Sequence, residues 1–307
     1  MKSDHSFKNI KALVIDLEGA LLNSMKDISP AASRILRDMH DKGVMIILCS
    51  SQNPMVISRQ LKYWQLDDCI PYIAGRWGSC LLNRYTGKLT SMAALPANSL
   101  ENLQQLALAN KIQPCIQQGR DLYVPESSFL STVLALKRRK NIVREPWPAN
   151  KPAGFLLLSG LPSSLRKFSS ALEDENVRLH SAGRFCSIIT PAAASFDQTV
   201  MSILNRHQLL PEEALTIAMR PEFAPLFEKT AGAAMKNADP ALLSCAQWTT
   251  KYPAAQDGAA YFINSALISG EFSFGNPSCL VHLPQSAETK PEPEQQQPEQ
   301  AAAGESK

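Results

Sequence analysis

The chain has 307 residues, of which 45% are hydrophobic and 19% are charged, and its formal net charge is +3 at pH 7. This length is enough for two domains, or for one domain that carries an insertion. The net charge is too small to indicate nucleic acid binding. The sequence contains no run of about 18 apolar residues, so we expect no membrane-spanning helix.

The start of the chain and its cysteines both indicate a cytoplasmic protein. The first five residues are polar and do not resemble a secretion signal. The seven cysteines are scattered, odd in number and never spaced as Cys-x-x-Cys, which argues against a disulfide framework and against a zinc site. We therefore expect buried thiols in a reducing compartment.

The first strong signal is an apolar run at residues 13–15 that ends on Asp16 and is followed by Glu18 and Gly19. A run this short and apolar is typical of a buried strand in a parallel sheet. Asp16 then lies at the carboxyl end of the strand, where parallel sheets bind ligands. The two carboxylates could attack a phosphorus atom or hold a hard cation, or they could only cap the turn.

A helix and a second buried strand follow. Ser29 is a good N-cap, the next residue is a proline, and the apolar periodicity after it ends at Gly43, which predicts a helix. Residues 44–48 then form the second apolar run, which brings Ser50 and Ser51 to the same edge of the sheet. Hydroxyl groups one strand away from a carboxylate are a phosphate-binding arrangement.

These two segments resemble the haloacid dehalogenase-like (HAD) superfamily, and within it the Cof-type sugar-phosphatase branch. Members of that family open with D-x-D-G-T-L-L at a strand end, and later carry a Thr or Ser followed by Gly-Arg. Here Asp16 begins D-L-E-G-A-L-L, and Ser50 begins S-S-Q. The resemblance implies an α/β fold, with a doubly wound parallel (Rossmann-like) core and an inserted α/β cap domain.

Further landmarks of the family set the expected domain boundaries. We expect the first part of the core at residues 1–79, the inserted cap at 80–187 and the second part of the core at 188–270. The cap assignment depends on short strands and helices that alternate with turn signals. Residues 286–307 are rich in Pro, Glu and Gln, which is typical of a disordered tail.

The resemblance also implies roles for individual residues. Active members are Mg²⁺-dependent phosphatases, in which the first Asp of the opening motif attacks phosphorus and the second serves as general acid and base. On this basis Asp16 and Glu18 occupy the catalytic positions, and Ser50 and Ser51 the phosphate-binding ones. Metal binding would fall to Asp16 and Glu18, with weak help from Glu222.

Several positions depart from the family pattern. Phe196 occupies the place of the lysine that offsets the charge of phosphate and nucleophile, and Ala218 occupies that of the principal metal-binding acid. Glu18 is one methylene longer than the family's Asp, and Trp77 stands where the family has Asn and could either narrow the pocket mouth or simply pack. Because phosphoryl transfer depends on positioning and on charge neutralisation, these changes affect its main requirements.

Two hypotheses follow for function. In the first, the protein retains the inherited reaction, Mg²⁺-dependent hydrolysis of a small phosphorylated metabolite through an aspartyl phosphate on Asp16, severely weakened or lost. In the second, it is a non-catalytic pseudophosphatase that acts as a ligand-binding or protein-interaction module, whose protein partner the sequence does not name. Arg220 is relevant to both, because it either points to solvent or forms an ion pair with Asp16 or Glu18 in place of the cation.

Overall fold

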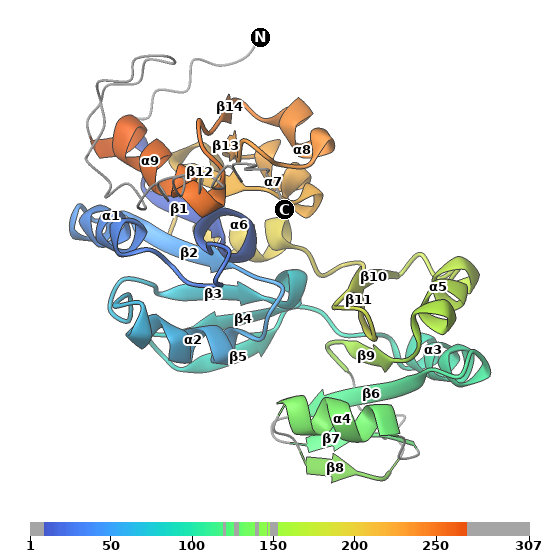
Figure 1. The fold of residues 1–307 in the computed structure, drawn as a ribbon. Helices are drawn as coiled ribbons and strands as arrows, with labels where there is room; N and C mark the ends of the chain where they lie inside the picture. The colour runs from blue at the N-terminus through green and yellow to red at the C-terminus, as the bar shows by residue number, and fades with distance from the viewer. Residues whose placement is uncertain are drawn as a thin grey trace, which may run out of the picture.

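A computed structural model of the chain describes residues 9–118, 121–125, 129–138, 141–145, 147 and 153–268. The described part contains an eight-stranded sheet and a six-stranded sheet. Figure 1 shows the two sheets in two lobes, with the helices packed around them. The expected tail at residues 286–307 lies outside the described residues.

The larger sheet has the strand order β14-β13-β12-β1-β2-β3-β4-β5. Its strands are β1 (Ala12–Asp16), β2 (Met45–Cys49), β3 (Tyr72–Gly75), β4 (Cys80–Asn83), β5 (Lys88–Ser91), β12 (Ala214–Ala218), β13 (Ala231–Ala234) and β14 (Trp248–Thr249). All neighbours from β14 to β3 are parallel, and β4 and β5 extend the sheet as antiparallel strands. The predicted α/β fold class is confirmed.

The described helices of this lobe include the one that the sequence predicts between Ser29 and Gly43. They are α1 (Pro30–Asp41), α2 (Pro54–Tyr63), α6 (Phe196–Arg206), α7 (Ala224–Phe227), α8 (Pro240–Cys245) and α9 (Gly258–Ile263). The Ser29 side chain accepts a 3.0 Å hydrogen bond from the backbone N–H of Ala32 and so caps α1. Shorter helical turns connect the elements, at η2 (Leu17–Leu21), η3 (Arg76–Gly78), η4 (Pro211–Glu213), η5 (Pro221–Phe223), η6 (Ala254–Gln256) and η7 (Asn264–Ile268).

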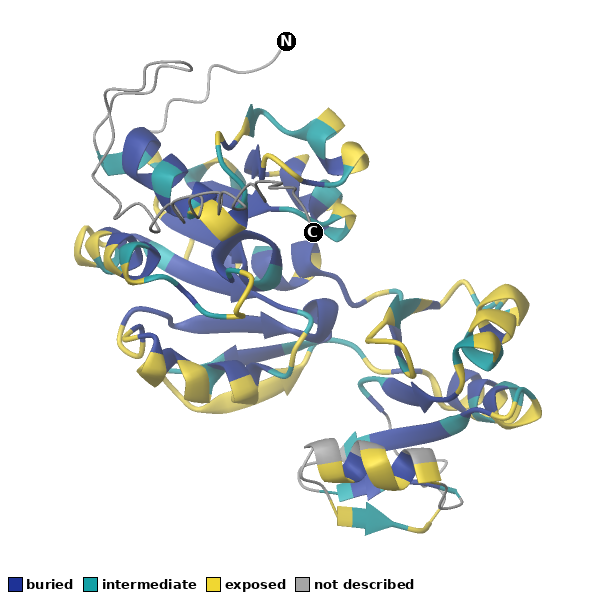
Figure 2. Ribbon diagram, in the orientation of Figure 1, coloured by how far each residue is buried: buried dark blue, intermediate teal, exposed yellow. Residues whose placement is uncertain are grey.

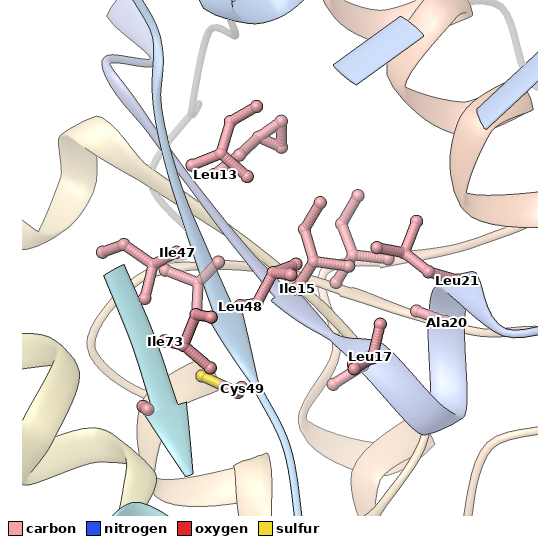
Figure 3. Close-up of a cluster of buried hydrophobic side chains, with 14 of the residues drawn as sticks. Leu13, Ile15, Leu17, Ala20, Leu21, Ile47, Leu48, Cys49 and Ile73 are labelled. Carbon is pink, nitrogen blue, oxygen red and sulfur yellow. The ribbon is translucent and has the colours of Figure 1, made fainter. Parts of the chain in front are cut away.

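The hydrophobic core of this lobe lies around the central strands. Figure 3 shows Leu13 and Ile15 of β1 close to Ile47 and Leu48 of β2, and these four side chains have no exposed surface. The central strands are also the continuous buried region in Figure 2. Burying a side chain of this size contributes about 1.5–3 kcal/mol, so the apolar runs of the sequence fix the middle of the sheet.

The smaller sheet has the order β10-β11-β9-β6-β7-β8. Its strands are β6 (Gln113–Gln118), β7 (Asp121–Tyr123), β8 (Asn141–Val143), β9 (Leu156–Ser159), β10 (Val177–Ser181) and β11 (Cys186–Pro191), and its helices are α3 (Ala97–Ala109), α4 (Phe129–Arg138) and α5 (Pro162–Ala171). Phe168 of α5 is fully buried in a cluster with Leu156 and Leu158 of β9.

The start of the insertion differs from the expected position at residue 80. Strands β4 and β5 pair with β3 in the larger sheet, so the smaller sheet begins only at β6. The alternating pattern of a strand shows which face is buried but not which sheet the strand joins. The division of the chain into domains stays a prediction.

The strand order of the larger sheet has a topological switch point between β1 and β12. From β1 the chain adds β2 and β3 on one side, and it later adds β12, β13 and β14 on the other side. The direction of winding therefore reverses between β1 and β12, and open α/β sheets bind ligands at the carboxyl ends of such a pair. Asp16 ends β1 and Ala218 ends β12 at this point.

None of the described helices is long and apolar enough to cross a membrane, and the cytoplasmic location stays a prediction. Three of the cysteines, Cys49, Cys69 and Cys115, are buried as expected. Cys80, Cys186 and Cys245 are only partly buried, because they lie near the edges of their elements, and Cys279 is outside the described residues.

Candidate functional site

The site begins at Asp16, which has no exposed surface. Directly after it the chain enters the turn η2. Gly19 in this turn lies against the Asp16 carboxylate, and a methyl group on Gly19 would overlap Asp16 Oδ2. The turn can close over the carboxylate only because residue 19 has no side chain.

Arg220 binds both oxygens of the Asp16 carboxylate. Arg220 Nε lies 3.1 Å from Asp16 Oδ2, and Arg220 Nη2 lies 2.7 Å from Asp16 Oδ1. Arg220 Nη2 is also 3.4 Å from Glu18 Oε2. This is the bidentate geometry that a guanidinium forms with a carboxylate. Of the two orientations that the sequence left open for Arg220, the structure has the one that faces the carboxylates.

The surroundings of this ion pair strengthen it. The exposed fraction of the side chain is 18% for Arg220 and 0% for Asp16, so solvent ions screen the pair only weakly. Burial by itself would lower the pKa of Arg220, but the charge and hydrogen bonds of Asp16, with the charges of Glu18 and Glu222, raise that pKa above its ordinary value. Arg220 therefore provides a permanent positive charge beside Asp16.

The Glu18 carboxylate turns the other way, toward the end of β2. Its Oε1 accepts hydrogen bonds from the hydroxyl of Ser50 and, at 3.2 Å, from Nε2 of Gln52. Its Oε2 accepts from the backbone N–H of Ser51 at 3.2 Å. The structure thus brings together Asp16, Glu18, Ser50, Ser51 and Arg220, which the sequence had singled out separately.

The sequence pattern of the haloacid dehalogenase-like hydrolases matches residues 13–263 of this chain. The chain belongs to this family. The resemblance inferred from the opening motifs is confirmed, and the matched stretch spans both sheets.

Relatives of known name or structure agree with this assignment. YxeH of Bacillus subtilis (strain 168), a protein named as a phosphatase, is 26% identical to this chain over 115 residues. These residues are 38% of this chain and 43% of YxeH. A crystal structure of a haloacid dehalogenase-like hydrolase from Bacteroides thetaiotaomicron has a TM-score of 0.70 at 19% identity, covering 83% of this chain and 98% of its own. The crystal structure of TM0651 from Thermotoga maritima has a TM-score of 0.69 at 15% identity, and the match covers 83% of this chain and 97% of TM0651. At these identities the likeness to solved structures shows the fold alone.

Haloacid dehalogenase-like hydrolases generally use Mg²⁺, but the side chains at this site do not fit a magnesium ion. Both Asp16 oxygens accept hydrogen bonds from Arg220, and Ala218 offers no side-chain ligand. The buried Oε2 of Glu222, the expected weak ligand, has no hydrogen-bond partner and stays open to a cation, but a single open carboxylate oxygen does not make a magnesium site. Within the described ranges, no three His, Cys, Asp or Glu side chains come together as a metal site.

Phe196, at the position of the family lysine, has a different role here. Its ring stacks on that of Phe223, with centroids 4.7 Å apart and an interplanar angle of 17°. The Arg220 Cζ lies 5.6 Å from both ring centroids, within the range of a cation–π interaction. Phe196 therefore supports the cation that Arg220 supplies, in place of supplying one itself.

A second aromatic contact lies between the two sheets. Trp77 of η3 stacks on His180 of β10, with ring centroids 4.1 Å apart and an interplanar angle of 15°. His180 Nε2 also lies 2.9 Å from the hydroxyl of Thr190. Of the two roles considered for Trp77, narrowing the pocket mouth or packing, the structure shows packing, against His180.

Burial, followed by the charges of Arg178 and Arg220, lowers the pKa of His180 from 6.5 to about 4. Between these two values the unfolded chain binds a proton that the folded protein does not, so the free energy of unfolding should rise with pH across this window. The contribution is present in full above pH 6.5 and is lost as the pH falls toward 4. After allowance for partial solvent exposure we expect about 1–2 kcal/mol.

Urea denaturation across this pH range measures the effect. His180→Phe keeps a ring against Trp77 and removes the titrating group, so its stability should vary less with pH than that of the wild type. An unchanged pH dependence in His180→Phe would assign the slope to other groups.

Three contacts of the site escaped prediction. The sequence indicated that Glu18 was longer than the family's Asp, but not that this length reaches Ser50. Gln52 was noted only as the last residue of the S-S-Q stretch and was given no role, and His180 was not identified at all. Glu222 carries a carboxylate at the expected place in the chain, and its charge acts on Arg220, but its buried Oε2 has no hydrogen-bond partner.

Proposed function

We propose that this haloacid dehalogenase-like protein is a pseudophosphatase, which does not hydrolyse phosphomonoesters and acts as a binding or protein-interaction module. The inherited reaction would be Mg²⁺-dependent hydrolysis of a small phosphorylated metabolite through Asp16. The observation that carries the proposal is the bidentate pair between Arg220 and Asp16. A carboxylate whose two oxygens accept hydrogen bonds from one guanidinium is a poor nucleophile and a poor metal ligand.

The missing groups add to this effect. Loss of a single preorganised electrostatic partner commonly lowers a catalytic rate by about 10²–10³. Here the lysine position holds Phe196, and the position of the main metal-binding acid holds Ala218. The first change removes a positive charge that the transferring phosphoryl group needs, and the second removes a ligand of the cation that would neutralise it.

The alternative is a weak phosphatase. It is supported by the position of Asp16 at the carboxyl end of β1, with Ser50 beside it after β2, because these two groups hold the places of nucleophile and phosphate ligand. In this alternative a phosphorylated substrate and Mg²⁺ together displace Arg220 from Asp16.

A hydrolysis assay separates the two functions. We expect the wild type to hydrolyse p-nitrophenyl phosphate and a panel of sugar phosphates no faster than Asp16→Asn, with or without Mg²⁺. The reason is that Arg220 already satisfies the carboxylate that would attack phosphorus. Magnesium-dependent turnover that disappears in Asp16→Asn would establish the alternative.

Calorimetric titration with Mg²⁺ in the absence of substrate tests the same point without activity. Because Mg²⁺ dehydrates only for near-octahedral oxygen ligands, we expect no micromolar binding. Arg220→Ala, which frees the Asp16 oxygens, is the comparison, and it should bind Mg²⁺ more tightly than the wild type. Micromolar binding of Mg²⁺ by the wild type would show that the side chains of the site do fit a magnesium ion.

A further inference from the structure

The Glu18 carboxylate is surrounded by hydrogen-bond donors. Three donors from the segment after β2 converge on it, namely the Ser50 hydroxyl, the Ser51 backbone N–H and the Gln52 side-chain amide. Arg220 Nη2 also lies 3.4 Å from Glu18 Oε2, the oxygen that accepts from Ser51. Four donors on one small anion are typical of an oxyanion-binding cradle.

The cradle is itself preorganised. Ser50 is fully buried. Its hydroxyl oxygen accepts a 3.0 Å hydrogen bond from the backbone N–H of Gln52. This bond directs the hydroxyl proton of Ser50 away from its own backbone and toward Glu18. The Ser50 hydroxyl and the Ser51 backbone N–H are therefore held in place, and they would present the same face to any anion of similar size.

The length of the side chain decides what fills this cradle. An aspartate at position 18 would end one methylene earlier, about 1.5 Å short of the present carboxylate. Glutamate spans that gap and leaves only 20% of its side chain exposed. The replacement of aspartate by glutamate thus does more than displace a general acid, because it places a negative group among the phosphate donors.

We propose that Glu18 is an internal anion, which occupies the cradle of Ser50, Ser51, Gln52 and Arg220 and keeps external phosphate groups out of it. This inference rests on the proposed function, and it adds that the site of this non-catalytic module does not accept a phosphate group. Arg220 replaces the cation of an active site and Glu18 replaces its anion. The two ionic positions are both filled by side chains of the chain itself.

Competition favours the internal group. A carboxylate attached to a fixed turn acts at an effective concentration of about millimolar or above, and it loses no translational freedom when it binds. A free oxyanion must displace the Glu18 carboxylate. It must also compete for Arg220, whose guanidinium already binds Asp16. Dilute inorganic phosphate therefore does not compete with Glu18.

The test is binding of inorganic phosphate, without Mg²⁺, by calorimetry and by the shift in melting temperature. We expect Glu18→Ala to bind phosphate at least about tenfold more tightly than the wild type. The double variant Glu18→Ala/Ser50→Ala should lose this gain, because the Ser50 hydroxyl is one of the donors. Glu213→Ala, which removes a carboxylate far from the site, should behave as the wild type does.

Two results would overturn the inference. One is a folded Glu18→Ala that responds to phosphate no more than the wild type, and the other is a double variant Glu18→Ala/Ser50→Ala that binds phosphate as tightly as Glu18→Ala. If Glu18→Ala does not fold, Glu18→Asp retracts the same charge by one methylene and should show a smaller gain of the same sign. Because the readout is binding without metal, a failure here leaves the hydrolysis result of the proposed function unaffected.

Discussion

Replacing Arg220 with alanine should lower the free energy of unfolding by about 3–5 kcal/mol, the range found when one partner of a buried ion pair is removed. Asp16 has no exposed surface, and without Arg220 its charge would lie in the protein interior with no cation beside it. Urea denaturation gives the value. Arg220→Lys keeps the positive charge but loses the bidentate fork, so it should lie between the wild type and Arg220→Ala.

Two controls separate the ion pair from general effects of substitution. The surface pair of Lys11 and Glu213 has a 58% exposed lysine side chain, and Lys11→Ala should cost less than about 1 kcal/mol. The double variant Asp16→Asn/Arg220→Met removes both charges and should recover most of the stability lost in Arg220→Ala. A loss of less than about 1 kcal/mol in Arg220→Ala would show that the pair contributes no more than a surface contact.

The second large effect concerns Gly78, which ends a left-handed stretch of backbone. Arg76, Trp77 and Gly78 have φ values of 51°, 55° and 88°. A methyl group on Gly78 would overlap the backbone carbonyl of Ser195, and the Gly78 carbonyl accepts a 2.7 Å hydrogen bond from the Thr199 hydroxyl. We expect Gly78→Ala to cost about 3–4 kcal/mol, because backbone conformation and close packing are both violated.

Gly43 provides the matched control for this prediction. Its φ is 82°, close to that of Gly78, but no atom lies within 4 Å of a methyl group placed on it. Gly43→Ala should therefore cost only the conformational strain, about 1 kcal/mol. Melting temperatures of the two variants give the comparison, and equal losses would show that the contact with Ser195 adds nothing.

Local features of the sequence predicted the elements well. Ser29, Pro30 and Gly43 marked the limits of α1 because capping depends on residues that are neighbours in the chain. The apolar runs before Asp16 and Ser50 marked β1 and β2 because strands buried on both faces tolerate few polar residues.

Contacts across the fold could be predicted only in part. Arg220 and Asp16 are separated by 204 positions, and the sequence left the direction of the Arg220 side chain open because local pattern does not encode it. The stack of Trp77 on His180 depends on how the smaller sheet lies beside the larger one, for which no residue is a signal. The assignment of β4 to the larger sheet was missed for a related reason, since strand pairing is a choice between partners.

The pair of Arg220 with Asp16 also changes how the folded state depends on its surroundings. A protein that needs a dissociable cation gains stability by mass action, as the logarithm of the cation concentration over its dissociation constant. Arg220 is part of the chain, so its concentration at Asp16 is set by the fold and cannot be diluted. We therefore expect the free energy of unfolding to stay the same at every concentration of divalent ion.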